Sequence, residues 1–388
     1  MQQDDAGRRH FIRNAALLSG AAVTLPSIGL GQARPDNKPA PPATNIADAL
    51  AIPRTATSMP GLYPGRVANV SDELCVRDGA PVEDRAALML ERGMLELTGA
   101  ASLKEAWLRF VSAEDMIGLK VNPVAGKLLS TSLALVRAVI AQLEAAGIPR
   151  DRIVIWDRRE FELHEVGFTA ENFPGIRITG TECKDAQGSF VDANGRLYSL
   201  DRIDKDWFYW ADCEEPYDAE TLPYMVNEGK HSYFPTLLTK ELTKVINIPI
   251  LKNAGNSITL CLKNLAYGAV TNTARLHKQL WGETSAQVPC FPPLRDKTVL
   301  NIVDGMIGCY DGGPGANAQF IVPYKRLLLG SDAVAVDRVG YEIVLAKRLA
   351  EGVQKKESPR GAAFLTMAES YGLGVADPAR ITRVDVAL

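Results

Sequence analysis

The sequence predicts an α/β fold in which a mostly parallel sheet is flanked by helices, with an inserted subdomain between the second and third core strands. Short apolar runs alternate with amphipathic helical segments, and polar residues recur where the apolar runs end. Of 388 residues, 46% are hydrophobic and 23% are charged, as in ordinary globular proteins. The net charge of −3 disfavours general nucleic-acid binding, which needs a basic excess.

The first 33 residues have the features of an export signal. Arg8 and Arg9 precede Phe11, and an uncharged run over residues 14–33 ends in small residues. Paired arginines in this setting are typical of a twin-arginine (Tat) signal peptide, so we expect a periplasmic protein exported in folded form by the Tat translocon. Pro26 interrupts the run and disfavours a membrane anchor. Removing residues 1–33 leaves a net charge of −4 and no expected membrane span.

The elements follow in chain order. Residues 34–66 carry seven prolines and are expected to form an extended leader or linker, and residues 67–388 to form the α/β domain. Apolar spacing predicts helices over 83–97 and 103–110, the second capped by Ser102. The apolar run over 116–121 predicts the first core strand.

A strand–helix–strand unit comes next. A cap among residues 130–132 opens a helix predicted over 133–145, Gly147 ends it, and residues 152–156 form the second strand. Such a connection makes the two strands parallel. Further strands are predicted over 244–248, 298–303, 326–329 and 381–386, and helices over 257–267, 333–349 and 362–371.

The inserted subdomain is expected over about residues 158–243. It holds an aromatic cluster within 206–215, including two of the chain's five tryptophans. Such a cluster serves either as the insertion's own core, the favoured interpretation, or as the lining of a substrate pocket.

Six cysteines are spread along the chain, no two closer than 19 residues. The missing Cys-x-x-Cys pattern disfavours an iron–sulfur cluster or zinc ribbon in this chain. Buried thiols are the simplest interpretation, although an oxidising periplasm would permit the pairs Cys183–Cys213 or Cys290–Cys309.

Candidate site residues recur at the carboxyl ends of the predicted strands, where open α/β sheets bind ligands. Lys120 lies in an apolar strand and Lys263 in an apolar helix, so burial would lower a lysine pKa and suit anion binding or acid/base work; a surface lysine is the alternative for Lys263. The candidates are catalytic Lys120, Lys252, Lys263, Asp157 and His277; substrate-binding Asn122, Asn264 and Gly313, the last in a glycine-rich loop; and the metal ligands Asp304 and Asp337. Asp332 is expected to cap a helix.

Several motifs together resemble one family, the domain of unknown function numbered 362. They are IGLKVN at 117–122, VIWD at 154–157, INIPILK at 246–252, TLCLKNL at 259–265, RLH at 275–277, IVDG at 302–305, GP at 313–314 and GSDAVAVD at 330–337. Some relatives carry iron–sulfur ferredoxin modules, so the resemblance implies redox-linked work with a redox partner protein. Relatives also have a histidine where this chain has Ala254, which disfavours a metal beside Lys252.

The leading hypothesis is an exported, oxidoreductase-like enzyme acting on a small anionic substrate at the strand carboxyl ends. One alternative is a non-catalytic periplasmic protein that binds a metal or an anion. Another is a hydroxy-acid racemase or isomerase, suggested by the set of lysine, histidine and aspartate residues. A metal ion is the candidate cofactor.

Overall fold

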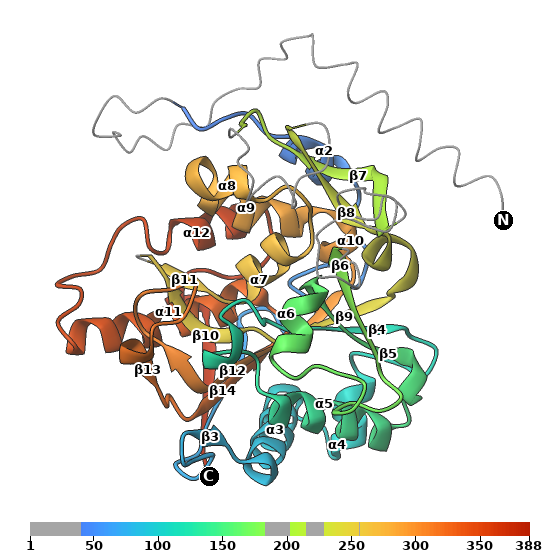
Figure 1. The fold of residues 1–388 in the computed structure, drawn as a ribbon, viewed down its shortest axis with the longest axis vertical. Coiled ribbons are helices and arrows are strands. Elements are labelled where there is room, and N and C mark those ends of the chain that lie inside the picture. The colour runs from blue at the N-terminus through green and yellow to red at the C-terminus, as the bar shows by residue number, and fades with distance from the viewer. Residues whose placement is uncertain (1–39, 183–201, 215–228, 256) are drawn as a thin grey trace.

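The computed structural model describes residues 40–182, 202–214, 229–255 and 257–388. It confirms the α/β prediction: a mixed, mostly parallel sheet is flanked by helices (Figure 1). The main path of the sheet runs through β15 (Thr382–Ala387), β1 (Arg66–Ser71), β14 (Arg326–Gly330), β12 (Thr298–Cys309), β9 (Lys244–Asn247), β4 (Ile117–Lys120), β5 (Ile153–Arg159) and β6 (Arg177–Glu182).

The strands that carry the site all run in one direction. From β12 through β9, β4 and β5 to β6, each neighbouring pair is parallel, so their carboxyl ends meet at one edge of the sheet. Beyond β12, strand β14 is antiparallel to both of its neighbours, β12 and β1, while β15 pairs with β1 in parallel. Next to β12 lie β10 (Ile250–Ala254), parallel to it, and β13 (Ile321–Val322), while β11 (Ser257–Thr259) pairs with β10.

The predicted strand–helix–strand unit is confirmed. Ser132 caps α5 (Leu133–Ala146), Gly147 ends it with a φ of 103°, and β4 and β5 pair in parallel. Helix α3 (Glu83–Thr98) and helix α4 (Leu103–Leu108), capped by Ser102 as predicted, pack with α5 on this side of the sheet.

Helices on the other side of the sheet pack around a second apolar cluster. They are α7 (Cys261–Gly268), α9 (Trp281–Gln287), α11 (Ala333–Ala350) and α12 (Ala363–Ser370). Alternation along β5 divides its side chains between the two faces: Ile153 and Ile155 join the cluster beneath α5, and Val154 and Trp156 join the one with α7. Each fully buried aliphatic side chain stabilises the fold by about 1.5–3 kcal/mol.

Two element predictions need correction. The segment expected to be one helix over 257–267 begins as strand β11, because Thr259 pairs with Lys252 of β10, and helix α7 starts only at Cys261. The segment expected to be an extended leader over 34–66 contains helix α2 (Ile46–Ala51), which buries Ala49. Tertiary contacts decide both cases, so the local pattern did not reveal them.

The remaining elements are short. They are β2 (Val76–Arg77), β3 (Ala80–Pro81), α6 (Glu160–Glu165), β7 (Ile203–Trp210), β8 (His231–Pro235), α8 (Ala274–Gln279) and α10 (Pro292–Arg295). Strands β7 and β8 form a separate two-stranded sheet within the expected insertion, whereas β6 of the same segment joins the main sheet. Tyr209 of β7 packs against Phe291 and donates to Gln287 Oε1 at 2.9 Å, which agrees with a core role for this aromatic cluster.

The structure bears on the predictions about disulfide pairing and about membrane spans. Cys290 and Cys309 are each buried and free, so the pairing considered for them is wrong. Cys183 and the export signal lie outside the described residues. Among the residues that are described, none of the helices is both long and apolar enough to cross a bilayer.

Candidate active site

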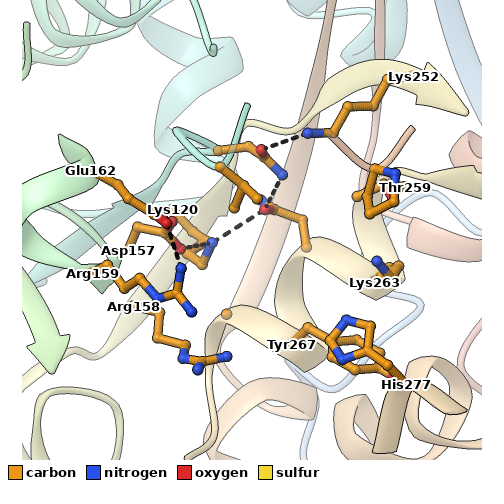
Figure 2. A pocket seen from close by; sticks show the side chains of 15 residues that line it. Lys120, Asp157, Arg158, Arg159, Glu162, Lys252, Thr259, Lys263, Tyr267 and His277 are labelled. Atoms are coloured by element: carbon orange, nitrogen blue, oxygen red, sulfur yellow. Dashed lines mark hydrogen bonds and ion pairs between the residues drawn. The ribbon is translucent and has the colours of Figure 1, made fainter. Parts of the chain in front are cut away.

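A cavity of about 150 Å³ lies at the carboxyl ends of β4 and β5, against α7 (Figure 2). It brings together all five predicted catalytic residues and both predicted substrate-binding asparagines. Its lining consists of Lys120, Asn122, Val124, Asp157, Arg158, Arg159, Glu162, Lys252, Thr259, Lys263, Asn264, Tyr267, Gly268, His277 and Pro314. We call it the inner cavity.

Lys120 and Asp157 form a buried ion pair in the wall of the inner cavity. Lys120 Nζ lies 2.5 Å from Asp157 Oδ1, and it also donates to the Val121 carbonyl at 2.9 Å and to Asn264 Oδ1 at 3.2 Å. Burial lowers the pKa of Lys120, while the Asp157 carboxylate acts in the opposite direction. Because its N–H groups already have partners, Lys120 is suited to hold the wall rather than to exchange protons.

Lys252 and Lys263 are placed differently from Lys120. Lys252 of β10 is fully buried and donates to Asn122 Oδ1 at 3.1 Å, while Lys263 of α7 is 4% exposed. The Lys263 ammonium lies 5.0 Å from the ring of Tyr267 and 6.0 Å from that of Trp281. In the described part of the chain, neither lysine forms an ion pair with a carboxylate.

The electrostatics of these two lysines suit chemistry near neutral pH. Burial and the nearby charge of Lys263 lower the pKa of Lys252 to about 7. Burial lowers the pKa of Lys263 to about 8. Lysines with such pKa values bind anions when they are protonated and accept protons when they are neutral.

His277 lies on helix α8. Its ring packs on Tyr267, with centroids 4.2 Å apart, and its Nδ1 lies 2.9 Å from the Thr273 carbonyl. Although the residue as a whole is exposed, the protein around its ring and the charge of Lys263 lower the pKa of His277, so the imidazole is neutral at pH 7. A neutral ring whose Nδ1–H donates to a carbonyl keeps Nε2 as a proton acceptor.

A chain of buried asparagines runs from the inner cavity into the core. Asn301 Nδ2 donates to the backbone carbonyls of Gly330 and Ser331, and its Oδ1 accepts from Asn247 at 2.9 Å. Asn247 Oδ1 accepts from Asn264 at 2.8 Å, and Asn264 Oδ1 accepts from Asn122 at 2.9 Å. Each amide therefore has one orientation, and the carbonyl oxygen of the last one faces Lys252.

Sequence reasoning missed the two inner members of this chain, Asn247 and Asn301. Both are fully buried in strands. A buried amide within an otherwise apolar strand needs a hydrogen-bonding partner, and that signal could have pointed to them.

Two arginines and a glutamate of the cavity were also missed. Arg158 donates to Thr273 Oγ1, and Arg159 Nη1 lies 2.7 Å from Glu162 Oε1. Arg158 and Arg159 end β5 directly after Asp157, and Glu162 follows in α6; this nearness to Asp157 was the available signal. Five basic side chains against two acidic ones line the inner cavity, which favours an anionic ligand.

A second cavity, the outer cavity, adjoins the inner one and has a volume of about 460 Å³. The two share Lys263, His277 and Pro314. The lining of the outer cavity is completed by Ala254, Gly255, Ser257, Trp281, Gly313, Arg360 and Gly361.

Gly313 lines the outer cavity, not the inner one, and its predicted role needs correction. Its amide donates to Asn253 Oδ1 at 2.8 Å, so this N–H is already used within the protein. A Cβ at this position would overlap the Asn253 carbonyl, which explains why a glycine stands here. Gly313 therefore shapes the cavity rather than binding an anion through its amide.

The predicted metal ligands lie outside both cavities and hold backbone amides instead. Asp304 accepts from the amides of Ser132 at 2.8 Å and Met306 at 3.3 Å. Asp337 accepts from the first amides of α7, Cys261 at 2.6 Å and Leu262 at 3.0 Å. Both predicted ligands are thus engaged by backbone amides, and within the described ranges no cluster of three His, Cys, Asp or Glu residues could hold a metal ion.

Asp332 confirms its predicted role at the start of α11. Its Oδ1 accepts from the Ala335 amide at 2.9 Å, which is the geometry of an N-cap.

Fold and site together define an α/β protein with a basic pocket at the carboxyl edge of its sheet. Residues 210–342 match the model of a family described as a domain of unknown function (DUF362), which supports the resemblance over that segment. The segment includes Lys252, Lys263 and His277.

A solved structure of a Thermotoga maritima protein is similar over 70% of this chain, with 8% identity and a TM-score of 0.38. This chain spans 60% of that protein's length. No curated protein matches the sequence.

Proposed function

We propose that this protein is an enzyme that binds a small anionic substrate in the inner cavity and transfers a proton to or from it. The observation that carries the proposal is the pair of buried lysines, Lys252 and Lys263, without carboxylate partners in the described part of the chain. A buried ammonium without a counter-ion is costly, and an anionic ligand supplies the missing charge.

The pKa values favour a proton-transfer role for these groups. A general acid or base works best when its pKa lies near the operating pH. The pKa of Lys252 is lowered to about 7, so close to neutral pH this lysine is present in both protonated and neutral forms. Lys263, with a pKa near 8, stays mostly protonated at pH 7 and would bind the anionic group.

The arrangement favours a racemase or isomerase over the other reactions considered. Such a reaction removes a proton from a carbon atom and returns one, which two acid/base groups achieve from different sides. Lys252 comes from β10 and His277 from α8, and Lys263 lies between them in the view of Figure 2. A 2-hydroxy acid held at Lys263 would present its Cα–H to this pair. The redox-linked step implied by the family resemblance stays a prediction.

Exchange with heavy water tests the proposed proton transfer. The protein is incubated with lactate, malate and mandelate in D₂O, and the Cα–H signal of each acid is followed by proton NMR. Loss of the signal of one acid is the expected result, and the variant His277→Asn should slow this loss at least tenfold. Binding of the acids with no exchange for any of them would favour the non-catalytic anion-binding protein instead.

We also propose that the protein is exported to the periplasm by the Tat pathway, on the basis of Arg8, Arg9 and the uncharged run that follows. Cell fractionation tests this. Replacing both arginines by lysine should leave the protein in the cytoplasm, while Arg13→Lys should not change its location. Export of the doubly substituted protein at the normal level would contradict the proposal.

A further inference from the structure

We infer that the outer cavity is the second half of the substrate site, and that the substrate is a carboxylic acid with a planar aromatic body. The carboxylate lies in the inner cavity and the aromatic ring lies against Trp281. This inference rests on the proposed function, since it assumes an anion at Lys252 and Lys263, and it specifies the class of that anion.

The volumes of the two cavities and the charges of their linings together assign the parts of the substrate. The inner cavity, at about 150 Å³, has room for roughly five water molecules at about 30 Å³ each. That space holds a carboxylate and the carbon atom attached to it, and the basic lining favours the carboxylate over an uncharged ring. The outer cavity has a volume of about 460 Å³, enough for a substituted aromatic ring.

The two cavities meet at the proposed anion-binding lysine, Lys263, and at His277, one of the two groups proposed to transfer protons. Lys263, His277 and Pro314 line both of them. A molecule that reaches from one cavity to the other therefore passes Lys263 and His277. In an arylacetic or arylglycolic acid the carbon between carboxylate and ring would lie at this junction, which is also the carbon that would lose its proton.

Trp281 makes the outer cavity selective for a flat apolar body. Its indole ring is held by Phe364 of α12, in an edge contact with centroids 5.3 Å apart. Its backbone carbonyl accepts from Ser285 Oγ at 2.8 Å, which fixes the first turn of α9. The side chain is only partly buried and lines the cavity, so a planar ring can pack on it without rearrangement of the protein.

The positive charges along the path from the outer to the inner cavity suit a carboxylic acid. Arg360 lies exposed at the outer cavity, and it forms no hydrogen bond or ion pair within the described ranges. Lys263 follows at the junction, and the basic inner cavity lies beyond it. Positive charges arranged in this order attract the carboxylate inward and leave the uncharged ring behind, next to Trp281.

Paired probes test the inference. Dissociation constants for acetate, which fills only the inner cavity, and for phenylacetate are measured by calorimetry or NMR titration. We expect phenylacetate to bind at least tenfold more tightly than acetate to the wild-type protein. Trp281→Ala should reduce the ratio of the two dissociation constants to a value between about one and three. Trp281→Phe, which keeps a ring, should retain most of the wild-type ratio.

A matched control uses Trp207 of β7, which is also partly buried but lines neither cavity. Trp207→Ala should keep the wild-type ratio. Equal affinities for the two acids in the wild-type protein would overturn the aromatic subsite while leaving the proposed anion site intact. A ratio unchanged by Trp281→Ala would overturn it as well. Failure of acetate and phenylacetate alike to bind would instead remove the proposed function.

Discussion

Three lysines in one cavity have different roles because their partners differ. Lys120 has an acidic partner 2.5 Å away in Asp157, so its charge is neutralised within the protein. Lys252 donates to the uncharged carbonyl oxygen of Asn122, and among the described residues Lys263 has only the faces of the Tyr267 and Trp281 rings. The last two ammonium groups are therefore the ones that a bound anion would stabilise.

Replacing Lys263 should weaken anion binding. Hydrogen bonds to charged groups contribute about 1.5–3 kcal/mol, so Lys263→Met should raise the dissociation constant for acetate roughly 10- to 150-fold at pH 7. The exposed Lys104 of α4 provides the matched control, and Lys104→Met should leave the constant within twofold. Equal affinities for the wild type and the Lys263→Met variant would remove Lys263 from the anion site.

At the scale of elements, helix α7 connects the site to the rest of the fold. Asp337 of α11 holds its first two amides, and every residue from Cys261 to Gly268 is buried. Gly268, the last residue of the helix, packs directly on Lys120, where a Cβ would overlap Lys120 Cε and Nζ. Close approach of α7 to β4 therefore requires a glycine at this position.

A methyl group at Gly268 should disturb both the fold and the site. Because Lys120 is held by Asp157, Val121 and Asn264, it has little freedom to move aside. We expect Gly268→Ala to lower the free energy of unfolding by about 1–3 kcal/mol, the usual cost of overpacking, and to weaken acetate binding.

Urea unfolding measures this effect, and helix α9 offers a control. A Cβ at Gly282 would meet only Phe364 Cβ at 3.5 Å, an ordinary contact. Gly282→Ala should therefore be neutral or stabilising by up to about 1 kcal/mol, as for other glycines in helices. Equal stability of the wild type and the Gly268→Ala variant would show that Lys120 tolerates the extra methyl group.

The same helix shows which features of an element its sequence can reveal. Capping residues such as Ser102 and Ser132 lie next to the helices they start, so local pattern located those starts correctly. The start of α7 depends on Asp337, which is 76 residues away from Cys261 in the chain, and its expected first turn is a strand. Sequence pattern carries no information about a cap supplied from such a distance.

For the whole molecule, topology explains why the catalytic candidates were found together and the metal candidates were not. Residues that end parallel strands converge at one edge, and Lys120 and Asp157 of β4 and β5 do so as predicted. Asp304 lies within β12, which continues to Cys309, so it is not at a strand end. The length of a strand depends on pairing partners such as β10 and β13, which the apolar run alone did not indicate.

Burial of two lysines should also make the stability of the ligand-free molecule depend on pH. In the unfolded chain both lysines have a pKa near 10.5, whereas in the folded protein the values are about 7 for Lys252 and about 8 for Lys263. Above pH 7 the unfolded chain therefore binds more protons than the folded one, and the free energy of unfolding rises with pH. Below about pH 7 both states are protonated, and the full destabilisation by Lys252 is present.

The expected slope from Lys252 alone approaches about 1.4 kcal/mol per pH unit, which gives a rise of about 2 kcal/mol between pH 7 and 8.5. The pH range of the test ends at 8.5 because of the buried thiols of Cys75 and Cys290, whose pKa values are raised to about 11 and 12. Thiols of the unfolded chain ionise near pH 9, and above that pH they lower the free energy of unfolding. Urea unfolding at both pH values should show this rise for the wild type and for Lys104→Met. Lys252→Met should be more stable than the wild type at pH 7. It should also lose most of the rise in the free energy of unfolding between pH 7 and 8.5, since methionine carries no proton to release. An equal rise in that variant would mean that Lys252 is not the group responsible.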